Sequence, residues 1–483
     1  MALPLNNNVV AAAGVVESDE NFVEEYNREL LQNVRNRLDV FDLNNEQLRR
    51  IMAILKTGLT QGLRSEQGYT MLPTYITTNT STINSNSIIL DLGGTRFKIY
   101  LVDTSGHIIK KTAKTIPEEM KNGSIQQLMS FMAVLLKSFL VEHGLPFNFE
   151  MPLGFTFSYP CEHNQQSTTS ACLLKWTKGF NAFGFAERNI VQLLRDACHV
   201  KGIELGLVTI INDTVGTMLA CALVNSECSV GIVVATGFNI AYMEKLDNIP
   251  KLNDPARMSS NKVICINTEI GSFGDNGLFN DYRNRFDRSL DEDSVNGGEQ
   301  LLEKMISGMY LGNLMKIVVH DFFNAGLIFN NNPNAITMLE EHNFFITPVI
   351  TKIEGVMRKS ERPLGTIQAL INEVGVPLSL TDCAVLAHVC TSICYRAEIL
   401  CAISVASICE HLESKNITIG VDSSVFYSKT ALERLESKIE SFIGIDKKIT
   451  LVRTAEASGR GAAVAAAMDI NALQSISWNC GIL

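Results

Sequence analysis

The sequence has no excess of positive charge. Its 41 Lys and Arg residues are outnumbered by 51 Asp and Glu residues, and the formal net charge is -10. Nucleic acids and anionic lipids favour a basic surface, because much of the affinity for them comes from neutralising phosphates. We therefore expect no nucleic-acid partner.

The sequence also lacks a disulfide framework and a long apolar run. Its 12 Cys residues form no C-x-x-C pair, and Cys390 and Cys394 lie among apolar residues at a spacing typical of a helix core. The most apolar stretch, 399–408, is too short to span a bilayer. Residues 1–18 carry no Lys or Arg before a short apolar stretch, which argues against a signal peptide, a transit peptide or a mitochondrial anchor. We expect a soluble, reduced, cytoplasmic protein with no transmembrane segment.

The length and composition indicate a large folded core. The chain has 483 residues, of which 46% are hydrophobic and 19% charged. These proportions exclude a disordered or fibrous protein and predict roughly two to four folding units.

Two parts of the chain share the order strand, small-residue turn, strand, strand. The expected strands are 88–92, 97–102 and 107–112 in the first part, and 230–234, 240–244 and 262–267 in the second. This repetition predicts an α/β architecture with two lobes, in which both turns direct backbone N–H groups toward a common cleft.

Helical patterns fill most of the remaining chain. Asn44 and Gln47 have the spacing of a capping box at the start of a helix. Stretch 298–324 predicts one long amphipathic helix, and 380–411 predicts one or two buried helices. Stretch 456–469 predicts a Ser-Gly-Arg-Gly turn followed by an alanine-rich helix.

Two aspartates stand where a strand ends. Asp91 precedes Gly93, Gly94 and Thr95; this pattern suits a phosphate-binding turn with Asp91 facing a hydrated Mg²⁺ ion, although a simple hairpin turn has the same pattern. Asp213 follows a strand and opens a helix, so it is either a helix cap or a general base.

Three further polar residues occupy similar positions. Glu269 follows an apolar strand, in surroundings that suit a carboxylate only if a partner such as a polyol binds it. Ser158 and Asn239 lie beside small-residue turns, where a local turn hydrogen bond is the default interpretation.

Taken in order along the chain, six segments resemble the eukaryotic hexokinase family. They are Leu90-Asp91-Leu92-Gly93-Gly94-Thr95, Leu153 to Cys161, Trp176-Thr177-Lys178-Gly179-Phe180, Asn212-Asp213-Thr214-Val215-Gly216-Thr217, Asn267-Thr268-Glu269 and Glu303 to Gly312. The resemblance extends from about Asn21 to Asp469. It implies the two-lobed actin/ribonuclease H-like ATPase fold and a single catalytic unit.

The resemblance implies a role for each matching residue. Asp213 would be the general base for the sugar 6-hydroxyl, and Lys178 would stabilise the transferring phosphoryl group as well as bind the sugar. The implied sugar-binding residues are Ser158, Thr177, Lys178, Asn212, Asp213, Asn239, Glu269 and Glu303.

The family also implies ATP and Mg²⁺, with the metal riding on the phosphates and no dedicated protein cage. The implied nucleotide-side residues are Asp91, Gly93, Gly94, Thr95, Thr236, Gly237, Thr347, Ser423, Ser424, Ser458 and Gly459.

The chain departs from the family pattern at several positions, most of them on the nucleotide side. Ala235, Ser423 and Ala457 stand where Gly is usual, and a side chain there would obstruct a positive φ or a close phosphate approach. Arg96 and Lys98 replace Asn and Arg. Phe238 replaces a small residue and Ile270 replaces Trp, each beside a sugar contact.

Three functions stay open on the sequence. The first is an ATP-dependent kinase that phosphorylates glucose, fructose or mannose at the 6-hydroxyl as the first step of glycolysis. The second is a sugar-binding sensor with weak phosphoryl transfer, which the nucleotide-side departures favour. The third is a kinase for a 2-substituted sugar such as N-acetylglucosamine.

The resemblance also predicts domain boundaries. We expect a flexible tail at 1–18, a large lobe from 20–74 and 213–456, a small lobe from 75–212 with helix 457–470 returning to it, and a C-terminal tail at 471–483. The last four residues, from Cys480, have the form of a prenylation box, which would provide only a weak membrane anchor.

Overall fold

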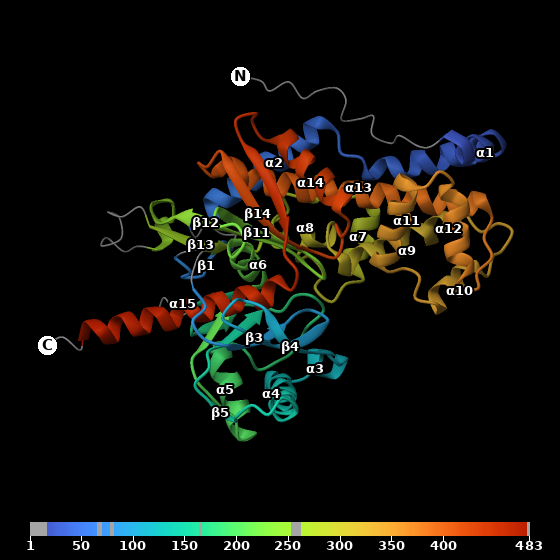
Figure 1. Ribbon diagram of the computed structural model, residues 1–483. Coiled ribbons are helices and arrows are strands. Elements are labelled where there is room, and N and C mark those ends of the chain that lie inside the picture. Colours follow the sequence, from blue (N-terminus) through green and yellow to red (C-terminus); the bar gives the residue numbers. More distant parts are fainter. Residues whose placement is uncertain (1–16, 65–69, 78–81, 164–166, 253–261, 481–483) are drawn as a thin grey trace. The chain divides into compact units, whose positions relative to one another are not determined.

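The computed structural model describes residues 17–64, 70–77, 82–163, 167–252 and 262–480, and Figure 1 shows the path of the chain. The chain divides into two compact units. The sheet unit comprises residues 57–270, 411–423 and 447–483 and contains every strand that the structure describes; the helical unit comprises residues 1–56, 271–410 and 424–446.

The first sheet of the sheet unit has five strands in the order β10-β6-β2-β3-β4. Consecutive strands β2, β3 and β4 pair antiparallel, and β6 and β10 extend the sheet in parallel from β2. The bounds are β2 (Ser87–Leu92), β3 (Arg96–Val102), β4 (Ile108–Thr115), β6 (Leu153–Phe157) and β10 (Val208–Ile211).

Side-chain alternation along β2 gives this sheet two apolar faces. Ile88 and Leu90 belong to the core formed with α4 (Ile125–Glu142) and α5 (Ile190–Val200). Ile89 belongs to a second core, formed with α6 (Asp213–Ala222) and α15 (Ala457–Cys480). Successive residues of a strand point to opposite faces, so a short apolar run can serve both cores.

The second sheet repeats this plan with six strands in the order β1-β13-β12-β11-β14-β15. Its strands β11, β12 and β13 are consecutive and antiparallel, and β14 and β15 extend the sheet in parallel from β11. The bounds are β1 (Leu72–Pro73), β11 (Cys228–Val234), β12 (Phe238–Lys245), β13 (Val263–Asn267), β14 (Asn416–Ser423) and β15 (Lys448–Arg453). The predicted duplication is therefore confirmed.

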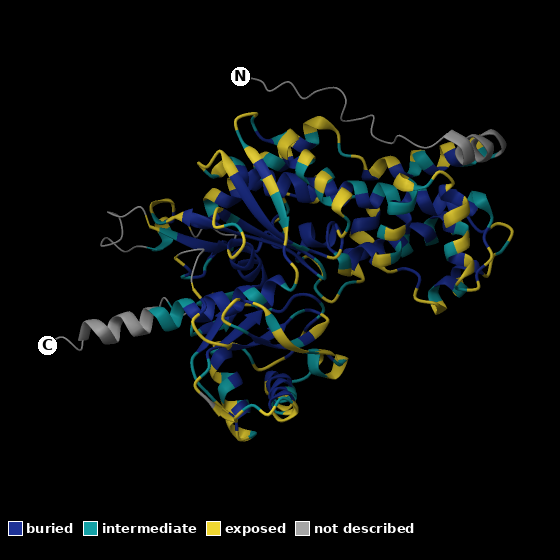
Figure 2. Ribbon diagram, in the orientation of Figure 1, coloured by how far each residue is buried: buried dark blue, intermediate teal, exposed yellow. Residues whose placement is uncertain are grey.

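Helices α6 and α15 pack closely against each other in the sheet unit. All ten residues of α6 are buried, as the dark blue ribbon in Figure 2 shows. A Cβ atom on Gly461 would lie 1.9 Å from the carbonyl oxygen of Gly216, so glycine at position 461 is required for this approach. The contact ties α15 to the helix that begins with Asp213.

Short elements complete the sheet unit. They are α3 (Glu118–Asn122), the parallel pair β5 (Asn148–Phe149) and β9 (Glu204–Leu205), and the antiparallel pair β7 (Cys161–His163) and β8 (Ala171–Leu173).

The helical unit is built around α13. Its helices are α1 (Glu17–Leu38), the first part of α2 (Asn45–Leu63), α7 (Arg285–Glu292), α8 (Leu301–Lys304), α9 (Gly308–Asn324), α10 (Ala335–Glu341), α11 (Thr347–Lys359), α12 (Pro363–Asn372), α13 (Leu380–His411, except its last residue) and α14 (Lys429–Phe442). Arg396 of α13 is 1% exposed and forms a two-pronged ion pair with Asp287, at 2.7 and 2.6 Å. Such bidentate pairing allows a guanidinium to be buried.

The structure confirms one predicted helix start and corrects another. Asn44 and Gln47 exchange the two hydrogen bonds of a capping box, at 2.9 and 3.0 Å. Stretch 298–324 is not one helix, because Gln300 has a left-handed backbone (φ 57°) and Ser307 an extended one. These two residues delay the start of α8 and separate it from α9.

The predictions for the two ends of the chain also change. Ser458 to Gly461 form the first turn of helix α15 and not a separate turn, and the helix continues to Cys480, so residues 471–480 of the predicted C-terminal tail are helical. Helix α1 begins at Glu17; residues 1–16 and 481–483, which hold the rest of both predicted tails and the end of the prenylation box, lie outside the described residues.

In the part of the chain that the structure describes, two helices are long and apolar enough to cross a membrane by length and composition alone. They are α4 and α13, and 44% and 89% of their most apolar windows are buried inside the fold. The 89% burial of α13 is typical of a core helix.

The compact units do not coincide with the predicted lobes. The six-stranded sheet, predicted to lie in the large lobe, shares the α6 and α15 core with the five-stranded sheet. The lobe boundaries 75–212 and 213–456 stay a prediction.

Candidate active site

Asp213 begins α6 at the carboxyl end of β10, and its neighbour Asn212 caps the helix. The Asn212 Oδ1 atom accepts hydrogen bonds from the Thr214 amide at 2.9 Å and the Thr214 hydroxyl at 2.6 Å. Asp213 is 8% exposed, and its Oδ1 atom has no hydrogen-bond partner among the described residues. The carboxylate is therefore not used as a cap, and one of its oxygens is available to a ligand.

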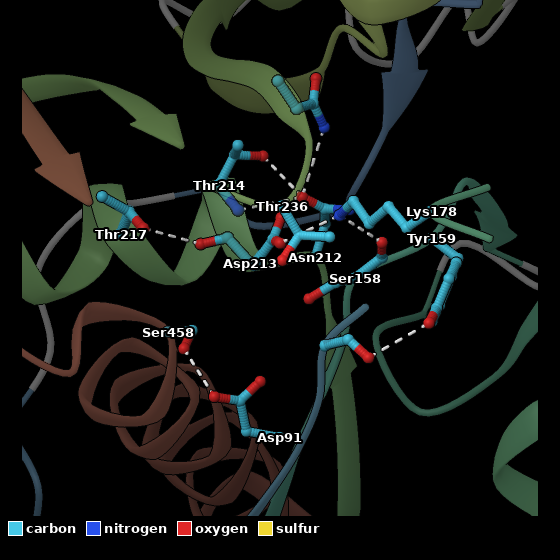
Figure 3. Close-up of polar contacts among 12 residues, drawn as sticks. Asp91, Ser158, Tyr159, Lys178, Asn212, Asp213, Thr214, Thr217, Thr236 and Ser458 are labelled. Atoms are coloured by element: carbon cyan, nitrogen blue, oxygen red, sulfur yellow. Dashed lines mark hydrogen bonds and ion pairs between the residues drawn. The ribbon is translucent and has the colours of Figure 1, made fainter. Parts of the chain in front are cut away.

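Lys178 holds the other oxygen of this carboxylate. Its Nζ atom donates to Asp213 Oδ2 at 3.3 Å and to the Ser158 carbonyl at 2.7 Å (Figure 3). The ammonium also lies 5.8 Å from the centre of the Tyr159 ring. Lys178 has φ 55°, an unusual backbone angle for a residue with a long side chain, and such strain is often found at functional sites.

A second polar cluster lies at the carboxyl end of β13 and the start of β12. Asn239 Nδ2 donates to Asn267 Oδ1 at 2.7 Å and to Glu269 Oε1 at 3.1 Å, and Asn267 Nδ2 donates to the same Glu269 oxygen at 2.8 Å. The Asn239 amide also lies 3.5 Å from Asn212 Oδ1, which joins this cluster to the start of α6. Glu269 has φ 50°, and burial raises the pKa of its carboxyl.

Asn267 lies in a segment that carries the family resemblance but was given no role of its own, although it holds Glu269. The available signal was its place in the Asn267-Thr268-Glu269 segment, two residues before Glu269 and at the end of β13. The default interpretation of Asn239 as a local turn residue is only partly right: its Oδ1 does accept from the next amide, at 2.8 Å, but its NH₂ group serves the cluster.

The two predicted phosphate-binding turns face each other. The Thr95 and Thr236 hydroxyls are 3.4 Å apart. A Cβ atom on Gly94 would lie 2.8 Å from Thr236 Cγ2 and 3.0 Å from Lys178 Cβ, so only glycine allows this approach. The structure therefore places the β2–β3 turn, the β11–β12 turn and Lys178 together.

Behind these turns, Asp91 is held from two sides. Its Oδ2 atom accepts from the Ser458 hydroxyl at 2.9 Å and from Lys98 Nζ at 3.2 Å. Asp422, at the end of β14, has a pKa raised to about 6 by burial and by the nearby Asp213, Asp91 and Glu456 carboxylates, although Lys98 opposes the shift. Asp422 is a further candidate that the sequence interpretation did not single out.

The oxygen atoms at this place suit Mg²⁺. Asp91 and Asp422 provide carboxylates, and Thr95 and Thr236 provide hydroxyls, which are the ligand types that the ion prefers. In the described part of the chain no group of three His, Cys, Asp or Glu residues lies close enough to hold a metal ion.

The backbone at the three glycine departures is ordinary. Among the described residues with positive φ, none is Ala235, Ser423 or Ala457. The Ser423 hydroxyl donates to the Val234 carbonyl at 3.0 Å, and Ala457 is fully buried. These substitutions therefore need no left-handed strain.

The two departures beside the sugar-binding candidates belong to the core. Phe238 is 1% exposed and Ile270 is 0% exposed. Both side chains pack in the interior next to Asn239 and Glu269.

The remaining predicted residues are buried, except Ser424, which is exposed. Ser158 and Thr177 are 3% and 4% exposed in the sheet unit. Glu303 on α8 and Thr347 at the start of α11 belong to the helical unit and are 3% and 5% exposed, and the Thr347 hydroxyl donates to the Gly308 carbonyl at 2.6 Å. Ser424 also belongs to the helical unit. The roles of Glu303, Thr347 and Ser424 stay predictions.

Duplicated strand-turn-strand sheets with two facing turns and buried carboxylates define the actin-like ATPase fold. Comparison with known proteins narrows this class. Two hexokinase family models match the chain, one over residues 33–223 and the other over residues 229–468. The chain belongs to the hexokinase family.

Individual relatives agree with this assignment. Human hexokinase-3 is 34% identical over 439 residues, which cover 89% of this chain and 46% of that protein. Rat hexokinase-2 is 32% identical over 449 residues, which cover 89% of this chain and 47% of that protein. The chain spans about half the length of these curated relatives.

A solved structure matches over nearly its whole length. Hexokinase from Schistosoma mansoni, complexed with glucose, superposes with a TM-score of 0.82 at 29% identity, covering 92% of this chain and 99% of that chain. A further hexokinase crystal structure has a TM-score of 0.70 at 24% identity and supports the fold.

Proposed function

We propose that this chain transfers the terminal phosphoryl group of ATP to the 6-hydroxyl of a hexose. The observation that carries the proposal is the Asp213 carboxylate, which has one oxygen held by Lys178 and the other without a partner among the described residues. Family membership and the match to a hexokinase bound to glucose support the same reaction.

In the proposed mechanism Asp213 accepts the proton of the 6-hydroxyl through Oδ1 as the hydroxyl oxygen bonds to the terminal phosphorus of ATP, and the bond from that phosphorus to the bridging oxygen breaks to release ADP. Lys178 keeps the carboxylate oriented through Oδ2 and provides positive charge beside the transferred group. Asn239, Asn267 and Glu269 form a preorganised set of donors and acceptors for sugar hydroxyls. Ser158, Thr177, Asn212 and Glu303 would complete the sugar site.

On the nucleotide side, Gly93, Gly94, Thr95, Thr236 and Gly237 would approach the phosphates. Asp91 and Asp422 would hold bound Mg²⁺, which would neutralise phosphate charge. Ser423, Ser424, Ser458, Gly459 and Thr347 would contact the adenosine part.

We also propose glucose, fructose and mannose as substrates, a place at the first step of glycolysis and a cytoplasmic location. The choice of these sugars is supported by the polar cluster in which Asn239 and Asn267 donate hydrogen bonds to Glu269. The alternative, a sugar sensor with weak phosphoryl transfer, is less well supported. Ala235, Ser423 and Ala457 do not have positive φ angles, so these side chains do not strain the backbone.

A coupled assay with purified protein, ATP and Mg²⁺ tests this function on glucose, fructose, mannose and N-acetylglucosamine. We expect turnover on the first three sugars. Turnover confined to N-acetylglucosamine would replace the substrate, and sugar binding without turnover on any of the four would establish the sensor.

A further inference from the structure

Glu456 stands at the start of α15 in an unusual conformation. It has φ 49°, and its carbonyl accepts the Arg460 amide at 3.1 Å, the first hydrogen bond of the helix. A left-handed backbone in a residue with a long side chain persists only where surrounding contacts hold it.

Three side chains from the neighbouring sheet hold the Glu456 carboxylate. The Tyr100 hydroxyl donates to Oε2, the Lys111 ammonium donates to Oε1, and the Lys98 ammonium lies 3.9 Å from Oε2. These contacts lower the pKa of Glu456 despite its partial burial. The carboxylate is therefore charged and directed toward β3 and β4.

Tyr100 also shapes the next residues of the helix. Its side chain is fully buried, and a Cβ atom on Gly459 would lie 2.8 Å from its ring. Ser458 lies between Glu456 and Gly459 in the sequence. Its hydroxyl donates to Asp91 at 2.9 Å, and its carbonyl accepts a hydrogen bond from the Thr156 hydroxyl at 3.1 Å. The first turn of α15 is thus fixed by contacts on both sides of Ser458.

The direction of the Glu456 carboxylate has an electrostatic consequence. Asp91 and Asp422 already bring two carboxylates to this end of the sheet unit, and Glu456 itself contributes to the raised pKa of Asp422. If Tyr100 and Lys111 released it, a third negative charge would be free to move toward the same place. A polyphosphate would then meet stronger repulsion.

We infer that Glu456 is a positioning residue for the nucleotide. Tyr100 and Lys111 hold its carboxylate, so that Glu456 fixes Ser458 and Gly459. The same contacts keep the negative charge of Glu456 away from the phosphates. The inference rests on the proposed function, since it assumes that a nucleotide binds at the start of α15. It predicts a loss of nucleotide affinity, and not of sugar affinity, when either holding contact is removed.

The test compares Tyr100→Phe and Lys111→Met with the wild type by calorimetry, using ADP with Mg²⁺ in one series and glucose in the other. Each change removes one hydrogen bond to a charged group, so we expect ADP affinity to fall about tenfold and glucose affinity to stay within about twofold. Lys111→Arg should restore most of the ADP affinity, because it keeps the charge and the donor.

Lys110→Met is the matched control, since Lys110 is the exposed neighbour on β4 and points to the other face. It should leave ADP affinity unchanged. Lys111 is 44% exposed, so its variant is expected to fold even if Tyr100→Phe is unstable.

ADP affinity within twofold of wild type in both variants would overturn the inference, as would an equal loss of ADP and glucose affinity. Because calorimetry needs no phosphoryl transfer, the two proposals can fail separately. A wild type that binds ADP in this way but phosphorylates no hexose contradicts only the proposed function; an active wild type with unaffected variants contradicts only the role of Glu456.

Discussion

Lys178 donates to Oδ2 of Asp213 at 3.3 Å, while Oδ1 of the same carboxylate has no hydrogen-bond partner among the described residues. The two residues are 35 positions apart in the chain. The contact divides the carboxylate into an anchored oxygen and an oxygen that can receive a proton. This asymmetry is what a positioned general base needs.

Replacing Asp213 should therefore stop transfer while sparing sugar binding. In Asp213→Ala we expect kcat to fall at least about a hundredfold, because the hydroxyl loses its proton acceptor, and the glucose dissociation constant to change much less. Steady-state kinetics and calorimetry measure the two effects. Asp247→Asn, an exposed carboxylate of the same unit, is the control. Wild-type turnover in Asp213→Ala would refute the assignment.

Asn267 offers a separate test of the sugar site. Asn267→Ala removes a donor to Glu269 and an acceptor for Asn239, so the buried Glu269 carboxylate loses part of its support. We expect KM for glucose to rise about tenfold with a smaller change in kcat, as for a lost hydrogen bond to a charged group. Glu269→Ala should raise KM further. A fall in kcat at unchanged KM would place these residues in the chemical step instead.

The three departures from glycine should tolerate reversion. Their backbone angles are ordinary, so the triple variant Ala235→Gly, Ser423→Gly, Ala457→Gly removes no strain. We expect ADP affinity within about threefold of wild type, and a free energy of unfolding lower by about 1 to 3 kcal/mol, because each glycine adds freedom to the unfolded chain.

Calorimetry measures the ADP affinity of the triple variant, and unfolding in denaturant measures its free energy of unfolding. A gain of a hundredfold in nucleotide affinity would show that side chains at these positions obstruct the phosphates.

Asp422 should make stability depend on pH. Its pKa is about 6 in the folded protein, above the ordinary 3.8, so folding binds a proton between these values and this carboxyl lowers stability as pH rises from about 4 to 6. Without nucleotide, Asp422→Asn should then be more stable than wild type by about 2 to 3 kcal/mol at pH 7.5.

The advantage of Asp422→Asn should shrink as the pH approaches 4, where the wild-type carboxyl is protonated in both states. Unfolding in denaturant at pH 4.5, 6 and 7.5 measures this trend. An advantage that does not vary with pH would mean that Asp422 is not desolvated as the structure implies.

Local sequence determined much of the fold. The strands around Gly93-Gly94 and around Thr236 follow from short apolar runs bounded by small residues, and the Asn44 cap follows from a side chain that can reach its own helix. Such features depend on neighbours in the chain, so they can be predicted within a few residues. The resemblance added the identities of Asp213 and Lys178, but not their geometry.

Tertiary structure decided which atoms meet. Lys178 reaches Asp213 Oδ2 from another segment, while Oδ1 has no partner among the described residues. The Glu456 carboxylate is directed toward β3 and β4 because Tyr100 and Lys111 reach it from those strands. The late start of α8 and the break between α8 and α9 likewise depend on the backbone angles of Gln300 and Ser307 respectively, which helical periodicity does not encode. Periodicity reports which side chains are apolar and where they repeat, whereas the partner of a buried charge is fixed by segments distant in sequence, and its contacts exist only after the chain has folded.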